Sequence, residues 1–93
     1  MKATLKKQLD EMTEDEIKSL LMRDYMRRLT RYRMTDDFFK KKYAMEFAEF
    51  EEKGIIREKN YSFEVESDAQ EWELALDGIK SMEEKMKEIS HEN

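Results

Sequence analysis

The sequence contains no cysteine, no proline and only two glycines among its 93 residues. Without cysteine the chain has no disulfide, no thiolate metal site and no cysteine nucleophile, which is typical of the reducing cytoplasm. Proline and glycine are the two strongest helix breakers, so their scarcity favours long helices. It also argues against a barrel or sandwich of strands, because those folds need many tight turns.

Long apolar runs are missing as well. No run approaches the roughly 18 residues that a membrane span needs, and no apolar stretch follows the basic N-terminal residues as in a signal peptide. We therefore expect a cytoplasmic protein with no membrane partner. The net charge of -5 makes nucleic acid an unlikely general partner.

Features of an active site or cofactor site are also lacking. The chain has no glycine-rich phosphate loop, and its one histidine, His91, stands at the C-terminal tail. The acidic run over 46–52 is the only candidate for a carboxylate metal site, and a solvated helix face explains it better. We find no convergent set of catalytic groups, so we predict no metal, no cofactor and no enzymatic activity.

The first helix is predicted over about 14–43. Thr13 and Glu16 have the spacing of a capping box, which marks a helix start. The apolar residues that follow are separated by three and four residues or sums of these: Ile17, Leu20, Leu21, Tyr25, Leu29, Tyr32, Phe39 and Tyr43. Either Thr35 caps a separate helix or one helix continues through it. We predict one helix, because the stripe resumes in phase at Phe39.

The remaining elements complete a hairpin. A short helix over about 46–53 should end at Gly54, followed by a polar loop over 57–61. Ser62 or Ser67 can cap a helix over about 64–90. Its apolar residues have the 4-3 spacing of a coiled-coil seam, with Gly78 off the seam: Val65, Ala69, Trp72, Leu76, Ile79, Met82, Met86 and Ile89.

These elements predict one all-α domain over 1–93, an antiparallel helical hairpin in which residues 1–12 either extend the first helix or fray. In such a hairpin Tyr43 should lie near Val65, and Phe39 near Ala69.

Apolar residues outside these seams suggest a second contact surface. Met22, Met26, Met34 and Phe38 form a second strip on the first helix, and Phe47 and Phe50 add apolar area near the turn. Trp72 either packs in the core or anchors a partner. We expect the surface to be completed by another protein or by a homodimer or larger helical bundle. The alternative is that the methionines cover the core of a well-packed monomer.

A basic patch lies on the first helix, where Arg23, Arg27 and Arg31 are spaced to share one face. Ordinary salt bridges to acids of the second helix are the first expectation. Binding to an acidic partner and binding to nucleic acid remain as alternatives.

Two stretches carry a resemblance to known proteins. Residues 42–52 (KYAMEFAEFEE) and 62–73 (SFEVESDAQEWE) resemble a group of small archaeal and bacterial helical proteins with the pattern K-Y-G-M-S-F-E-E-F-E, then S-W-E-V-E-x-D-x-x-E-W-E. Ala44 and Glu46 replace the glycine and serine of that pattern. The group resembles the antitoxin-like partners of small toxins.

The resemblance implies a protein-protein interaction module that acts as the antitoxin-like partner of a small toxin. A homo-oligomeric bundle with a scaffolding role and a nucleic-acid-binding protein are the alternatives.

Overall fold

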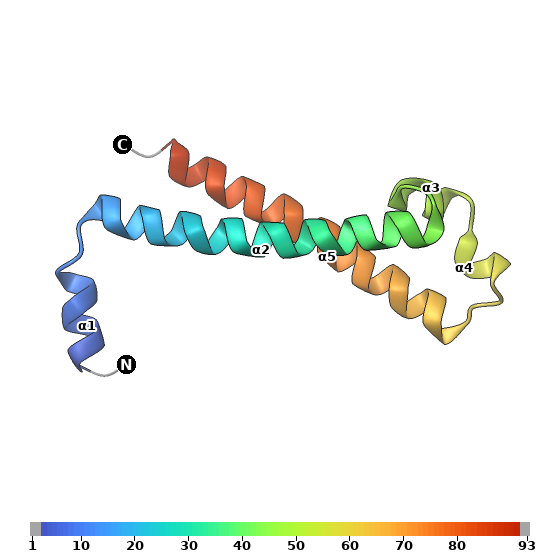
Figure 1. Ribbon diagram of the computed structural model, residues 1–93, viewed down its shortest axis with the longest axis horizontal. Coiled ribbons are helices and arrows are strands. Elements are labelled where there is room, and N and C mark those ends of the chain that lie inside the picture. The colour runs from blue at the N-terminus through green and yellow to red at the C-terminus, as the bar shows by residue number, and fades with distance from the viewer. Residues whose placement is uncertain (1–2, 92–93) are drawn as a thin grey trace.

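The computed structural model describes residues 3–91 and confirms the predicted all-α helical hairpin. Within this part of the chain lie α1 (Ala3–Asp10), α2 (Glu14–Tyr43), α3 (Phe47–Glu52), α4 (Ile55–Glu58) and α5 (Phe63–Ser90). The molecule is elongated, with extents of 57 × 30 × 16 Å. The long helices α2 and α5 run antiparallel and cross near their middles (Figure 1).

The helix α2 begins and ends where local chemistry requires it. The Thr13 hydroxyl accepts a hydrogen bond from the Glu16 backbone N–H at 3.1 Å and donates one to the Glu16 carboxylate. The helix runs through Thr35, whose hydroxyl bonds the Arg31 carbonyl one turn earlier at 3.2 Å instead of capping a new helix. It stops because Ala44 adopts the left-handed conformation, with φ 57°.

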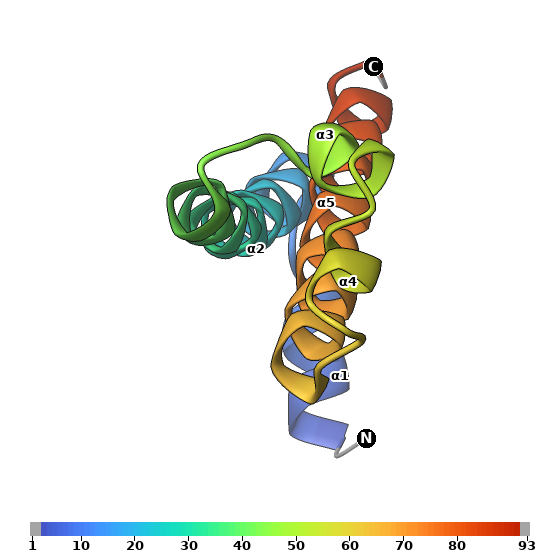
Figure 2. The ribbon, with the colours of Figure 1, turned by 90° about the vertical axis from the view of Figure 1, so that its right-hand side faces the viewer.

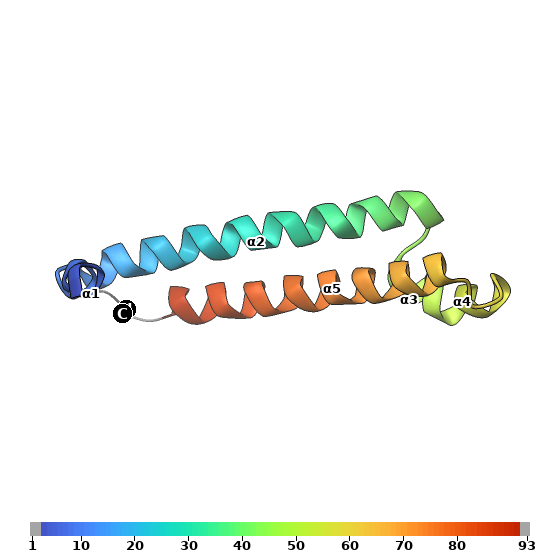
Figure 3. The same ribbon diagram turned by 90° about the horizontal axis from the view of Figure 1, so that it is seen from below.

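The molecule has two layers. α2 forms one layer, and α5 forms the other together with α3 and α4, which lie beside the first half of α5 (Figures 2 and 3). A methyl group added at Gly78 would lie 2.5 Å from Cε2 of Tyr32, so the glycine allows α2 and α5 to approach closely. The prediction that Gly78 lies off the seam is therefore wrong, because this position faces α2.

One end of the hairpin contains the main core. We call the part formed by residues 36–76 the closed end, because the chain turns there. The buried cluster joins residues of α2, α3, α4 and α5: Phe39, Phe50, Ile55, Val65, Ala69 and Trp72. The ring of Trp72 stacks on Phe39 with centroids 5.7 Å apart and meets Phe50 edge to face at 5.3 Å. α3 and α4 thus fill the space that opens where the two long helices diverge.

The other end lacks such a filling element. We call residues 3–28 together with 83–91 the open end. No side chain from 4 to 28 or from 83 to 91 is buried. α1 turns away from the hairpin (Figure 1), and its Leu5 and Leu9 remain 51% and 41% exposed.

The connection between α2 and α5 differs from the expected turn and loop. Gly54 does end the short helix, with φ 63°, and Ser62 rather than Ser67 caps α5, accepting from the Val65 N–H at 3.3 Å. Residues 57–61 are not entirely loop, because α4 extends to Glu58. Asn60 and Tyr61 then take left-handed conformations that complete the turn.

The pairing of the long helices is close to the predicted one. Phe39 shares the buried cluster with Ala69, and Tyr43 packs against the cluster that contains Val65. The direct contacts also reach further along α5, since Tyr43 bonds with Asp68 and Phe39 stacks on Trp72. None of the described helices is long and apolar enough to cross a bilayer.

Candidate protein-binding surface

The outward face of α2 carries a second line of residues spaced by three and four. We call this line the outer seam: Leu20, Arg23, Arg27, Arg31, Met34, Phe38 and Lys41. Residues of α2 that contact α5, such as Tyr32 and Asp36, lie roughly on the opposite side of the helix, given about 3.6 residues per turn. All seven side chains of the outer seam are exposed.

The four apolar residues predicted to form one strip do not share a face. Met34 and Phe38 belong to the outer seam and are 65% and 60% exposed. Met26 is 46% exposed on another side of α2, and Met22 is half-buried. The predicted strip is wrong because a step of four residues advances by about 40° beyond a full turn, so the positions spiral around the helix.

Three other predicted contact residues belong to the core. Trp72 is fully buried and Phe50 is 1% exposed, while Phe47 is half-buried and packs edge to face on Trp72 at 5.1 Å. The indole N–H of Trp72 donates to the Asp36 carboxylate at 2.8 Å, which satisfies its one polar atom. The proposal that Phe50 and Trp72 contact a partner is therefore corrected, since both side chains are inside the hairpin.

The arginines of the basic patch carry unneutralised charge. Arg23, Arg27 and Arg31 are exposed, and none of them forms an ion pair within residues 3–91. We expected the arginines of α2 to form salt bridges with acids of α5. Among the described residues only Arg33 does so, with Glu83 at 3.2 Å. The side-chain charges along the outer seam are therefore available to a ligand.

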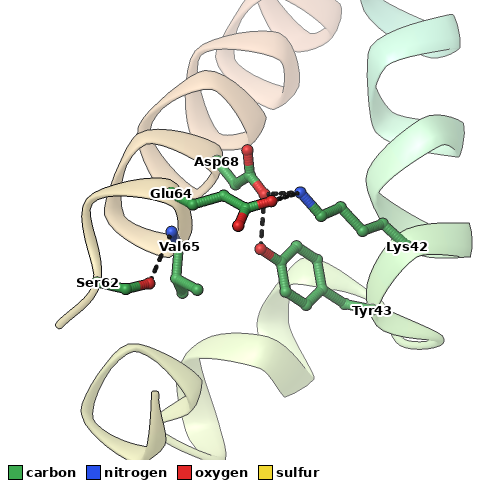
Figure 4. A network of polar contacts seen from close by, with 6 residues as sticks. All are labelled: Lys42, Tyr43, Ser62, Glu64, Val65 and Asp68. Atoms are coloured by element: carbon green, nitrogen blue, oxygen red, sulfur yellow. Dashed lines mark hydrogen bonds and ion pairs between the residues drawn. The ribbon is translucent and has the colours of Figure 1, made fainter. Parts of the chain in front are cut away.

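A polar cluster joins the last turn of α2 to the first turns of α5 (Figure 4). The Lys42 ammonium donates to Glu64 at 2.8 Å and to Asp68 at 2.6 Å. The Tyr43 hydroxyl donates to the same Asp68 oxygen, also at 2.6 Å. We interpret the cluster as a clamp that holds the closed end together.

The pKa values of the clamp follow from these contacts. Burial raises the pKa of Tyr43 to about 12, and its hydrogen bond to Asp68 acts in the same direction. Hydrogen bonds to Asp68 and Glu64 raise the pKa of Lys42. Burial alone would raise the pKa of Asp68, but hydrogen bonds from Lys42 and Tyr43 outweigh it and lower that pKa.

The acidic run over 46–52 does not gather into a site. Glu46 approaches Lys40 at 3.8 Å and Glu49 approaches Lys53 at 3.6 Å, so these two acids pair with neighbouring lysines. Among residues 3–91 no group of three histidine, aspartate or glutamate side chains is arranged to hold a metal ion.

Grooves adjoin both the open end and the outer seam. A shallow groove of about 500 Å³ separates the beginning of α2 from the end of α5, and Met22 and Ile89 line it from opposite helices. A second groove, of about 300 Å³, runs beside the outer seam and includes Arg31 and Tyr32. Both are open, so they suit a docked surface better than an enclosed small molecule.

The spacing of the outer seam was visible in the sequence but was not recognised there. A search for apolar periodicity skips the arginines that occupy its central positions. Comparison with known proteins adds no assignment, since no protein-family model, no curated protein sequence and no solved structure matches this chain.

Proposed function

We propose that this chain is a non-enzymatic protein-protein interaction module whose α1–α2 surface is covered by another protein. The observation that carries the proposal is the distribution of exposed apolar side chains. Among the described residues, eight of the eleven large exposed hydrophobic residues lie in α1 and α2: Leu5, Leu9, Ile17, Leu20, Leu21, Met26, Met34 and Phe38.

The location of these residues indicates a binding surface, in contrast to the scattered exposed hydrophobic residues that most proteins carry. Single exposed hydrophobic residues are common, but contiguous apolar surface marks interaction sites. Ile17 and Leu21 are one helical turn apart and are 40% and 39% exposed. At the closed end the chain covers comparable side chains with α3 and α4. The open end has no such cover of its own, so a partner helix in this position would complete the fold.

The resemblance to antitoxin-like proteins suggests which kind of partner this is. We propose a small toxin, encoded beside this chain, as the partner. The residues that carry the resemblance include Tyr43, Phe50 and Trp72, which build the core and the clamp. If the resembling proteins have these residues for the same reason, they share the hairpin fold. The surface that contacts the partner is then formed by other residues.

Co-expression with the product of the neighbouring gene tests the proposal. Size-exclusion chromatography with light scattering should show a complex with the wild-type chain and none with the double variant Ile17→Glu and Leu21→Glu. Leu74→Glu is the matched control, because Leu74 is 68% exposed on α5, away from the proposed surface. Absence of a wild-type complex, or equal disruption by Leu74→Glu, contradicts the proposal.

A homo-oligomeric helical bundle is the second candidate, and the exposed apolar residues of the open end favour it too. Sedimentation of the pure protein distinguishes the two functions. A stable dimer or tetramer at low micromolar concentration supports the bundle. A monomer that enters a complex only with the neighbouring gene product supports the first candidate.

A further inference from the structure

The outer seam combines apolar and cationic residues in an order that specifies a ligand. Leu20 stands at one end, Arg23, Arg27 and Arg31 occupy the centre, and Met34 and Phe38 follow before Lys41. We propose that the outer seam binds an acidic amphipathic helix of a partner protein. This inference rests on the proposed function and adds the chemistry recognised by the outward face of α2, which is a different face from the one that carries Ile17 and Leu21.

Within residues 3–91 no acid forms an ion pair with a cation of the outer seam, although Glu16 lines a groove together with Leu20 and Arg23. Asp24 lies beside the seam, but its carboxylate pairs with Arg28 at 3.1 Å. Asp37 likewise approaches Lys40 at 3.6 Å. No acidic residue belongs to the seam itself, so its four cations face solvent together. A ligand with several carboxylates matches this pattern, and each arginine can hold one carboxylate through two hydrogen bonds.

The length and spacing of the outer seam match a helix. The seam extends over about 31 Å, from 1.5 Å per residue between positions 20 and 41. Its steps of three and four residues are those by which one helix packs along another. A complementary partner helix would place apolar residues opposite Leu20, Met34 and Phe38. It would place carboxylates opposite the three arginines and Lys41.

A second copy of this chain fits the outer seam poorly. Pairing two outer seams about a two-fold axis would place the central arginines of one copy against those of the other, which is repulsive. The outward face of α5 is more acidic, but its exposed apolar residues Phe63 and Leu74 are eleven positions apart. On the outer seam, Leu20 and Met34 are fourteen positions apart. The two spacings differ by three residues, or about 4.5 Å along the helix, so both apolar pairs cannot meet at once.

Nucleic acid also fits less well than an acidic helix. Phosphates would engage the cations, but they offer nothing to the exposed side chains of Met34 and Phe38. The net charge of -5 opposes approach to a polyanion as a whole. A protein helix uses both the charged and the apolar parts of the outer seam.

A designed peptide provides the test. The probe is a dye-labelled helical peptide of about 21 residues, with leucine at the positions that face Leu20, Met34 and Phe38 and glutamate at those that face the arginines and Lys41. The control peptide carries glutamine in place of each of these glutamates. Fluorescence anisotropy should show saturable binding of the acidic peptide to the full chain, at least tenfold tighter than the control. Raising the salt from about 50 to about 300 mM should weaken binding severalfold.

Variants of the protein locate the binding site. The triple variant Arg23→Gln, Arg27→Gln, Arg31→Gln should weaken binding of the acidic peptide at least tenfold. The matched control Lys59→Gln, Lys80→Gln, Lys87→Gln removes the same charge from exposed positions elsewhere and should change binding less than twofold. Both triple variants should remain helical, because glutamine, arginine and lysine have similar helix propensities. Far-UV circular dichroism checks this.

Four results overturn the inference. They are no binding of the acidic peptide up to about 1 mM, equal binding of both peptides, equal effects of the two triple variants, and tighter binding of a DNA duplex than of the acidic peptide. Sedimentation of the wild-type chain alone adds a fifth, because self-association lost in the arginine variant would make a second copy the occupant. If the neighbouring gene product still forms a complex, the interaction function survives and only the assigned ligand fails.

Discussion

The closed and open ends of the hairpin are built from the same two helices but are packed differently. At the closed end, α3 and α4 cover the gap between α2 and α5, and Trp72 is fully buried among aromatic rings. At the open end, no third element of the described residues 3–91 occupies the gap, and Ile17 and Leu21 remain 40% and 39% exposed. The two-helix seam alone buries isolated residues such as Leu29 and Met82, whereas an aromatic core forms where a further element completes the seam.

The closed end supplies most of the stability of the chain, and the open end supplies exposed surface for binding. Burial at the closed end gives most of the hydrophobic stabilisation, since that stabilisation follows apolar area removed from water. The open end contributes less to folding and so remains available to a partner. Substitutions at the closed end should therefore lower the free energy of unfolding more than substitutions at the open end.

The largest effect is expected at the centre of the closed end. Trp72→Ala removes the side chain on which Phe39, Phe47 and Phe50 pack, and should lower the free energy of unfolding by about 3–5 kcal/mol. Leu21→Ala at the open end should cost less than about 1 kcal/mol, because the side chain is already partly solvated. Urea denaturation measures both, and equal losses would contradict the distinction between the ends.

The crossing point between the ends should give an intermediate effect. Gly78→Ala brings a methyl group against the Tyr32 ring and should destabilise the protein by about 1 kcal/mol net. In a Tyr32→Ala background the same change should stabilise it by about 1 kcal/mol, because alanine is the better helix former. A double-mutant cycle measured by thermal denaturation reports this change of sign. Destabilisation in both backgrounds would show that the ring is not the obstacle.

The clamp makes the closed end sensitive to pH. The pKa of Asp68 is lowered in the folded chain, so its contribution is complete above the ordinary carboxyl pKa of 3.8. That contribution is lost as the pH falls through the lower folded value. The pKa of Tyr43 is raised from 10.0 to about 12, so its contribution is complete below pH 10 and is lost as the pH rises toward 12.

In the Asp68→Asn variant, stability should fall less between about pH 6 and pH 3 than in the wild-type chain. The urea concentration at the midpoint of unfolding measures this fall at each pH. Asp77→Asn is the control, because it removes one exposed carboxyl from the same helix and leaves the clamp intact. If both variants change the acid dependence equally, the clamp is not its source.

The smallest effect on folding is expected on the outer seam. Met34→Gln replaces a side chain that is 65% exposed and should change the free energy of unfolding by less than about 0.5 kcal/mol. Differential scanning calorimetry measures the change as a small shift in the melting temperature. A loss above about 1 kcal/mol would mean that Met34 packs inside the free protein.

The long helices could be predicted because their signals are local. The cap at Thr13 and the apolar steps of three and four residues specify α2 without reference to the rest of the chain. The individual contacts between α2 and α5 could not be predicted in the same way. Contacts such as the hydrogen bond between Tyr43 and Asp68 depend on the left-handed turn at Ala44 and on how α3 and α4 fill the closed end.

The candidate surface was predicted only in part. Met34 and Phe38 are exposed as expected, but Met22 lies partly in the groove between the long helices. Phe47 and Phe50, near the turn, belong to the core because both pack on Trp72. Their spacing in the sequence does not predict this contact, because Trp72 lies on another helix. The arginines were predicted as a patch, but a pattern restricted to apolar residues did not join them to Leu20 and Phe38.

Hydrogen exchange on the free protein tests the unequal packing of the two ends most directly. The slowest exchange is expected for amides of α5 between positions 69 and 75, whose side chains include Ala69, Trp72 and Ala75 in the core. Much faster exchange is expected across 14–24 and 83–90. Uniform protection along both long helices of the monomer would contradict the unequal packing, because the open end would then be as stable as the closed end without a partner.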